Sequence, residues 1–345
     1  MKPFVSILVP AFNAERWIGD CIKSAISQTW PFKEVVVVDD GSRDATLEIA
    51  RSFSSTNVQV ISQENRGAGA ARNLALSLAQ GDYIQWLDAD DILSADKVSL
   101  QLEIEKSGTI SRTLLSGAWG RFHTCPQRAR FVPTGLWMDL QPAEWLFRKL
   151  DGNLWMAIES WLVSRRLIEL AGPWNETLSL DDDGEYFCRV IRHSTNIRFV
   201  GKSQCFCRRG TSSLSNELTL SDQKMESQAA SLVEHVRTLM SLEDSTRTRG
   251  ASLKLLFRWS SFFWPDRPDL WQRMRLLSNE LGVELPQPLS REGNGWMRRI
   301  IGQSRAKRAR RILSDFRSRA SELWEHLLCR TFPPRWTSSN PPKRG

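Results

Sequence analysis

The sequence predicts an α/β fold with a mostly parallel central sheet, helices on both faces of that sheet, and a helical region towards the C-terminus. Three observations support this prediction. Short apolar runs alternate with helical patterns over residues 4–87, which is typical of parallel strands joined by crossover helices. Polar clusters follow the ends of several of these runs. Past about residue 218, strand patterns become scarce and helical patterns replace them.

The apolar runs are rich in β-branched residues, which suit strands buried on both faces. We expect these strands at residues 4–9, 34–40, 58–61 and 83–87. Helical spacing of apolar residues predicts helices at residues 15–30, 42–53 and 68–81, the last of them ending at Gly81. In such sheets ligands bind beyond the carboxyl ends of the strands, which is where the polar clusters lie.

The pattern loosens after about residue 110. Strands are expected at 113–122 and 160–164, and helices at 142–150, 165–172 and 181–194. Helical patterns cover 221–282, a linker with Pro and Gly covers 283–295, and a basic helical stretch covers 296–328. We therefore expect a domain at 1–218, made of halves 1–110 and 111–218, and a helical basic region at 219–345 with a disordered end.

The net charge of +8 is confined to one segment. Residues 291–320 contain ten basic and two acidic residues, so the rest of the chain is neutral. Because no nucleic-acid-binding motif occurs, we expect no nucleic-acid partner. Apolar residues recur at helical intervals within 296–328, which fits either a helix on an anionic membrane surface or a helix packed on the body.

The N-terminus lacks the pattern of a secretory signal, and no run reaches the roughly 18 apolar residues of a spanning helix. The six cysteines include no C-x-x-C pair, so we expect reduced thiols. Cys205 and Cys207 would share one face of a strand. They could bind a metal together, or they could be two small residues packed in the core or on the surface. We expect a cytoplasmic location, with peripheral attachment to the inner face of the membrane through 296–328.

Three carboxylates, Asp88, Asp90 and Asp91, follow the strand expected at 83–87. Oxygen ligands suit Mg²⁺ and Mn²⁺, which usually combine one or two carboxylates with substrate phosphates and water. A solvated acidic turn or a helix cap would have the same sequence. The motif alone therefore leaves a metal site and a simple turn open.

Two further segments have the residue types of a nucleotide site. The carboxylate of Asp40 follows the second strand, where it can accept hydrogen bonds from a base or a ribose, although a β-turn would look the same. Gly67 and Gly69 permit close backbone approach, and Arg72 can supply a charge to a diphosphate. The absence of a P-loop and of G-x-G-x-x-G after the first strand argues against kinases, ATPases and dinucleotide-binding enzymes.

The combination is more specific than its parts. The segments "VSILVPAFNAERWI", "EVVVVDDGSRDAT" and "NRGAGAARNLALSLAQGDYIQWLDADD", in this order and spacing, resemble the family 2 glycosyltransferases of GT-A fold. The resemblance is dense over residues 4–106, patchy over 155–215 and not visible after about 220. It implies that residues 1–110 bind a nucleotide-sugar, that 111–218 bind the acceptor, and that a hexosyltransferase-like enzyme inverts the anomeric configuration.

In the nucleotide-sugar half the resemblance implies roles for five residues. Pro10, Phe12 and Asn13 match the loop that wraps the base, with Phe12 in place of a more usual Tyr. Asp40 matches the carboxylate that reads the base, and Arg72 matches an arginine near the diphosphate.

Asp88 and Asp90 match the D-x-D motif of the family, with Asp90 as the metal ligand and Asp88 as a residue that binds the donor. The resemblance therefore implies a divalent metal, Mn²⁺ or Mg²⁺, and a UDP- or GDP-linked sugar as the donor.

The general base is expected in the second half. Residues 172–190 resemble the Gly-Gly-Phe-x-x-x-Leu segment of the family, which is followed by an acidic pair and then by an arginine. Counted back from Arg189, the pair falls on Asp182 and Asp183. Asp183 is the candidate base and Asp182 its close rival. The same carboxylates would also cap the helix that follows them.

The acceptor half also contains Trp137, Trp155 and Trp161, which could stack on a sugar or pack in the core. The resemblance suggests a saccharide or lipid-linked acceptor in the synthesis of a cell-surface polysaccharide or glycolipid. Two alternatives stay open at this point. A sugar nucleotidyltransferase would need a Gly-rich loop after the first strand, but no glycine precedes Gly19. A basic nucleic-acid-binding protein would fit the pI of about 9.4, but the charge is confined to the C-terminal segment and no RNA- or DNA-binding motif occurs.

Overall fold

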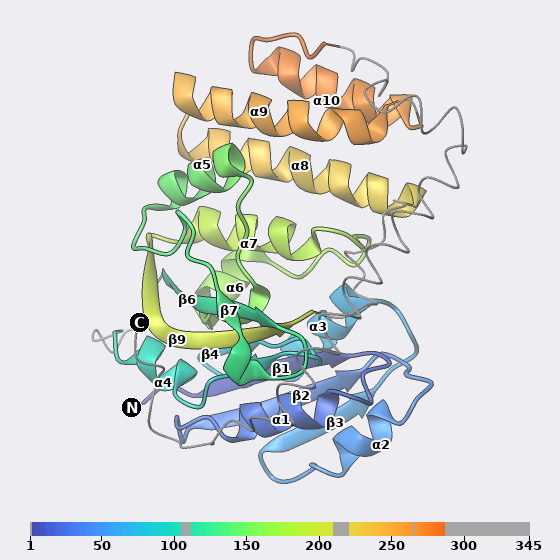
Figure 1. The fold of residues 1–345 in the computed structure, drawn as a ribbon, viewed down its shortest axis with the longest axis vertical. Coiled ribbons are helices and arrows are strands. Elements are labelled where there is room, and N and C mark those ends of the chain that lie inside the picture. The colour runs from blue at the N-terminus through green and yellow to red at the C-terminus, as the bar shows by residue number, and fades with distance from the viewer. Residues whose placement is uncertain (1, 105–111, 210–220, 265, 287–345) are drawn as a thin grey trace.

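The computed structural model describes residues 2–286, with gaps at 105–111, 210–220 and 265. Its N-terminal part is a five-stranded sheet in the order β3-β2-β1-β4-β8 (Figure 1). The strands are β1 (Val5–Ala11), β2 (Lys33–Asp39), β3 (Val58–Ser62), β4 (Tyr83–Trp86) and β8 (Val163–Ser164). The first four run parallel and β8 is antiparallel, which confirms the mostly parallel sheet.

Three helices cross over between the parallel strands, namely α1 (Ile18–Ile26), α2 (Thr46–Arg51) and α3 (Ala68–Leu78). All three are shorter than the sequence predicts. The carboxylate of Asp44 accepts the Thr46 N–H at 3.0 Å, so α2 begins several residues later than expected.

The prediction that Gly81 ends α3 is wrong, because the helix already ends at Leu78 and Ala79 is extended. Gly81 is instead required by close packing. A Cβ at this position would lie 2.4 Å from the backbone nitrogen of Ser6 on β1.

A second, mixed sheet follows in the order β5-β9-β6-β7. Its strands are β5 (Ile92–Leu93), β6 (Thr113–Phe122), β7 (Arg130–Phe131) and β9 (Asn196–Arg208). The central pair, β6 and β9, runs parallel with a bulge between Gly117 and Ala118. Of the strand expected at 160–164, only β8 forms. It follows a 3₁₀ turn, η2 (Ile158–Ser160).

The remaining helices are α4 (Lys97–Leu102), α5 (Pro142–Gly152), α6 (Arg165–Ala171), α7 (Asp182–His193), α8 (Asp222–Leu242), α9 (Thr246–Phe263) and α10 (Pro268–Glu280). Most of them lie beyond this sheet, whereas α4 packs against β9 and β6 near the first sheet (Figure 1). A short 3₁₀ turn, η1 (Pro126–Arg128), precedes β7. Helix α8 packs on α7 and α9, and α9 packs on α5, so the predicted helical C-terminal region is present.

Within the described ranges, no helix combines the length and apolar character needed to span a membrane. The basic stretch 296–328, expected as a membrane-surface helix, lies outside the described residues.

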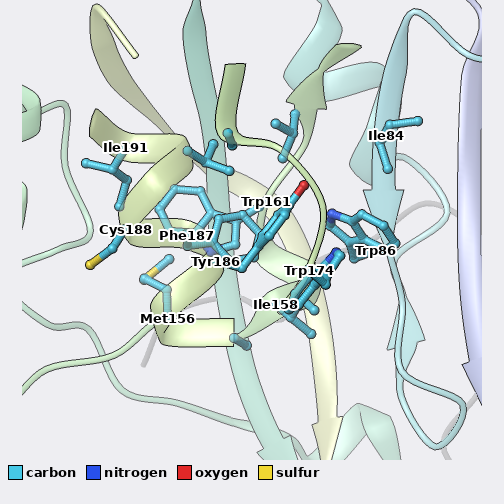
Figure 2. Packing of buried hydrophobic residues seen from close by; sticks show 14 of the residues in the cluster. Ile84, Trp86, Met156, Ile158, Trp161, Trp174, Tyr186, Phe187, Cys188 and Ile191 are labelled. Carbon is cyan, nitrogen blue, oxygen red and sulfur yellow. The ribbon is translucent and has the colours of Figure 1, made fainter. Parts of the chain in front are cut away.

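A cluster of aromatic rings joins α7 to the first sheet. Trp174 stacks on Tyr186 at a centroid distance of 3.9 Å, and Trp86 meets Trp174 edge-on at 5.3 Å. Figure 2 shows these rings packed together between α7 and β4. Because β4 leads into the Asp88–Asp91 turn, this packing fixes α7 relative to that turn.

Candidate active site

The carboxyl ends of β1, β2 and β4 meet at one edge of the first sheet, as the sequence predicts. Asp40, directly after β2, is buried there and organises the loop before α3. Its carboxylate accepts hydrogen bonds from the Gln63 side chain at 2.6 Å, from the Arg66 N–H at 2.9 Å and from the Gly67 N–H at 2.8 Å. Asp40 therefore stabilises the conformation of residues 63–67, whether or not it also contacts a ligand.

The loop after β1 lies beside this edge. Phe12 is 49% exposed, which leaves its ring free to contact a flat ligand. Asn13 adopts a positive φ of 49°, and its side-chain oxygen accepts the Arg43 N–H at 2.9 Å. Pro10 lies opposite Val38 of β2, but the pairing of β1 with β4 already ends at Leu8. The N–H that proline lacks is therefore not needed for a hydrogen bond to β4.

Arg72 on α3 connects the two halves of the domain. Its Nη1 donates to Asp182 at 2.7 Å and its Nη2 to Asp88 at 3.1 Å, while its guanidinium lies 4.5 Å from the Trp174 ring centroid. Burial alone would lower the pKa of Arg72, but the two carboxylates hold that pKa above its ordinary value. Arg72 is thus a permanent, buried cation between the D-x-D turn and α7.

Glu159, on η2, faces the D-x-D turn and was not foreseen from the sequence. Carboxylate oxygens of Asp88, Asp91 and Glu159 lie within 4.8 Å of one another. The Glu159 Oε1 atom is buried without a hydrogen-bond partner among the described residues. Oxygen donors at this spacing, with an unsatisfied buried oxygen, fit Mg²⁺ or Mn²⁺.

Burial and mutual repulsion raise the pKa values of Asp90, Asp91 and Glu159. Burial and the neighbouring Asp88 raise the pKa of Asp90 to about 6 and that of Glu159 to about 8. Burial and the facing Glu159 raise the pKa of Asp91 well above its usual range. A cation held here would relieve that repulsion. Asp90, the expected ligand, lies beside the three-residue cluster and is not one of its members.

The end of β9 is tied to the same turn through Arg208. Its N–H donates to Asp91 at 2.6 Å, its Nε donates to the Asp90 carbonyl at 2.9 Å, and its guanidinium lies 4.0 Å from the Trp17 ring centroid. Residues 210–220, which follow this arginine closely in the chain, lie outside the described residues.

Cys205 and Cys207 do share one face of β9, beside Glu159. The Cys207 thiol donates to the Glu159 carboxylate at 3.5 Å. A hydrogen bond with Cys205 and burial raise the pKa of Cys207 well above its ordinary value, which keeps it a protonated thiol. All five cysteines within the described ranges are free, as expected for reduced thiols.

The acidic segment before α7 is held by α8. Asp181 adopts a positive φ of 56°, and Ser231 of α8 donates to its carboxylate at 2.5 Å. The Ser227 hydroxyl accepts the N–H groups of Ser179 and Leu180, both at 3.0 Å. The helical C-terminal region therefore fixes the loop that carries the candidate base.

Asp183 lines a small pocket of about 30 Å³, part of which is open to solvent. Residues from α5, the following loop and α7 form its walls. They include Trp145, Lys149, Trp155, Met156, Trp161 and Phe187. Burial, followed by Asp182 and Asp181, raises the pKa of Asp183 to about 7. Trp155 and Trp161 thus share a pocket with Asp183, whereas Trp137 stacks on Phe199 elsewhere.

The comparisons with known proteins agree with this arrangement. Residues 6–109 match the sequence model of glycosyl transferase family 2. Chondroitin synthase from Escherichia coli is 45% identical over 103 residues, which are 29% of this chain and 15% of that protein. The putative teichuronic acid biosynthesis glycosyltransferase TuaG of Bacillus subtilis is 40% identical over 117 residues, 32% of this chain and 46% of that protein. The match therefore spans less than half the length of either relative.

Two solved structures share the fold over most of the chain. The S. aureus TarS fragment 1–349 in complex with UDP-GlcNAc has a TM-score of 0.61 at 18% identity and covers 82% of each chain. The mannosyltransferase PcManGT from Pyrobaculum calidifontis, in complex with GDP-Man and Mn²⁺, has a TM-score of 0.51 at 16% identity and covers 94% of this chain and 88% of its own. These likenesses establish the GT-A fold.

Proposed function

Residues 6–109 belong to glycosyl transferase family 2, and from this premise we propose that the chain is an inverting, metal-dependent glycosyltransferase. It moves a sugar from a UDP- or GDP-linked donor to a hydroxyl of a saccharide or lipid-linked acceptor, in the synthesis of a cell-surface polysaccharide or glycolipid. One observation carries the proposal: Arg72 bonds to both Asp88 and Asp182, so the D-x-D turn and the acidic pair of α7 form one site.

The donor occupies the edge formed by the ends of β1, β2 and β4. The exposed ring of Phe12 stacks on the base, with Pro10 and Asn13 shaping the loop around it. The Asp40 carboxylate, which accepts three hydrogen bonds already, has room for one more from the base. Arg72 is close enough to the D-x-D turn to contact the diphosphate.

Asp90, with Asp88, would hold the metal, and the carboxylates of Asp91 and Glu159 lie close to that of Asp88. When bound, Mn²⁺ or Mg²⁺ supplies Lewis-acid stabilisation to the departing diphosphate. The fit of the turn to a divalent cation rests on the grouped oxygens and on the unsatisfied Glu159 oxygen. The Mn²⁺ in the PcManGT complex supports the same cofactor.

Asp183 accepts the proton of the attacking acceptor hydroxyl. Inverting transfer is a single displacement, so one base on the acceptor side suffices. Asp182 is occupied by Arg72 at 2.7 Å, whereas Asp183 has no ion-pair partner among the described residues and lines a small pocket with Trp155 and Trp161. A pKa of about 7 lets Asp183 exchange protons near neutral pH. These contacts favour Asp183 over Asp182 as the base.

A donor screen tests the proposal. The purified full-length chain is incubated with Mn²⁺ or Mg²⁺ and a panel of UDP- and GDP-sugars, and thermal shift and slow donor hydrolysis are recorded. We expect one donor class to stabilise the protein and to be hydrolysed only with metal. Asp90→Ala should abolish the metal-dependent part. No stabilisation or hydrolysis with any donor, or undiminished metal stimulation in Asp90→Ala, would contradict the proposal.

A further inference from the structure

Arg121, near the end of β6, lies against two indole rings. Its guanidinium is 5.1 Å from the ring centroid of Trp119 and 4.9 Å from that of Trp155. The two rings are themselves only 4.3 Å apart, tilted by 36°. Trp119 is buried, but Trp155 is 41% exposed, so one large flat ring is open to a ligand beside a positive charge.

The charge of Arg121 is not balanced within the described chain. No carboxylate there forms an ion pair with it, and the rings that cover it accept none of its in-plane N–H donors. Burial, together with the neighbouring Arg209, lowers the pKa of Arg121. Two adjacent arginines, one of them half-buried, make a place where an anion would be stabilised.

Arg121 lies between the two parts of the active site. In the β6–β9 register it stands opposite Cys207, whose thiol contacts Glu159 beside the D-x-D turn. On its other side, Trp155 forms part of the wall of the Asp183 pocket. Arg121 therefore contacts, through Trp155 and Cys207, residues of both parts of the site.

Side-chain alternation places Arg121 and Phe122 on opposite faces of the sheet. Phe122 packs under Arg208, which holds the D-x-D turn. Arg121 lies on the face of Cys207, whose thiol contacts Glu159. Nucleotide-sugar binding by Arg121 variants therefore distinguishes a contact with the acceptor from a contact with the donor.

We propose that Arg121, assisted by Arg209, binds an anionic group of the acceptor, a carboxylate or a phosphate, while Trp155 stacks on the sugar that carries it. This inference rests on the proposed function, because it assigns the chemical class of the acceptor for the same site. It selects acidic saccharides over neutral ones.

Calorimetric titration of the full-length protein tests the proposal with paired probes. One pair is a disaccharide ending in glucuronic acid and the same disaccharide with the carboxyl group reduced to an alcohol. The second pair is glycerol 3-phosphate and glycerol. Inorganic phosphate serves as a free anion. We expect at least one charged probe to bind about tenfold or more tightly than its neutral partner and than inorganic phosphate.

Arg121→Gln should abolish the preference for the charged probe, and Arg121→Lys should keep part of it. Arg209→Gln should weaken it. Lys202→Gln is the matched control, because Lys202 is an exposed cation on β9, the strand that pairs with β6, and its loss should leave the preference intact. Thermal unfolding reports whether each variant is folded, and nucleotide-sugar binding reports whether its donor site is intact.

Three results would overturn the inference. The first is equal binding of the charged and neutral members of both pairs. The second is binding of inorganic phosphate as tight as that of the glucuronic acid disaccharide or of glycerol 3-phosphate. The third is loss of nucleotide-sugar affinity in a folded Arg121→Gln variant, which would place the arginine in the donor site. The titration is independent of turnover. If the chain transferred no sugar from any donor, the proposed function would fail, while the comparison of charged and neutral probes would still decide the role of Arg121.

Discussion

Replacing Ser227 by alanine should loosen the loop that carries the candidate base. The Ser227 hydroxyl accepts the N–H groups of Ser179 and Leu180, both at 3.0 Å, and donates to the Leu180 carbonyl at 2.7 Å. Ser227 is only 2% exposed, so water cannot readily take its place. One hydroxyl on α8 thus satisfies three backbone groups just before Asp181.

The cost of this substitution can be worked from those three contacts. A typical hydrogen bond contributes about 0.5–1.5 kcal/mol, and a buried polar group left unpaired costs about 1–3 kcal/mol. Ser179 and Leu180 are partly exposed, so some of the released groups can turn to water. We therefore expect Ser227→Ala to lower the free energy of unfolding by about 2–3 kcal/mol.

The same change should affect catalysis more than donor binding. The loop leads directly into Asp183, and a displaced base loses alignment with the acceptor hydroxyl. The donor edge is built from β1, β2 and β4, none of which touches Ser227 through a hydrogen bond in the described chain. We expect kcat to fall about tenfold or more, with the KM for the nucleotide-sugar little changed.

Urea unfolding followed by tryptophan fluorescence, together with steady-state kinetics, measures both effects. Ser241→Ala is the control, because Ser241 is an exposed serine on α8 whose hydroxyl bonds only to Thr238 of the same helix, at 2.8 Å. It should change stability by less than about 0.5 kcal/mol. If Ser227→Ala were as stable as this control and kept its kcat, α8 would not position the loop.

Three other predictions follow from the site and the fold. Because burial and neighbouring carboxylates raise the pKa of Asp183 to about 7, kcat should rise with pH through that value as the base loses its proton. Asp183→Asn should lower kcat at least about tenfold and abolish this rise, and an unchanged pH profile in the variant would exclude Asp183 as the base. Glu159→Gln should raise the metal concentration needed for half-maximal donor hydrolysis about 10- to 100-fold, and an unchanged metal-activation curve would count against Glu159. Gly81→Ala should lower the free energy of unfolding, measured by heat or urea, by more than about 1 kcal/mol, because the new Cβ would lie 2.4 Å from the Ser6 nitrogen. Gly250→Ala in α9, where the Cβ would meet open space, should raise the free energy of unfolding by about 0.5–1 kcal/mol, and equal effects of the two substitutions would refute the packing argument.

The sheet and the donor edge could be predicted because their signals are local. Continuous β-branched runs identify buried parallel strands, and the acidic turn stands directly after one of them. The same local signals cannot show what a carboxylate bonds to. Asp40 fits a base-reading residue from its place after β2, yet the structure also uses it to hold residues 63–67. Both tasks demand the same residue at the same strand end.

Glu159 could not be predicted, because its role depends on contacts distant in sequence. It is one glutamate within an apolar stretch, and no spacing relates it to Asp88 or Asp91. Only the pairing of β8 with β4 brings η2 to the end of β4. Gly81 was misread for a related reason, since a glycine after a helix is usually a cap, and its close contact with Ser6 is set by the β1–β4 register.

Charge balance explains why the D-x-D turn and the acidic pair have to be treated as one site. Asp88 and Asp182 lie on separate elements, and both bond to the single guanidinium of Arg72. A buried cation needs a well-placed anionic partner, and the removal of either carboxylate would leave charge poorly compensated. Arginine suits this position, because its forked guanidinium bonds to both carboxylates while it lies 4.5 Å from the Trp174 ring centroid. Any ligand anion that enters between the two carboxylates must share that guanidinium.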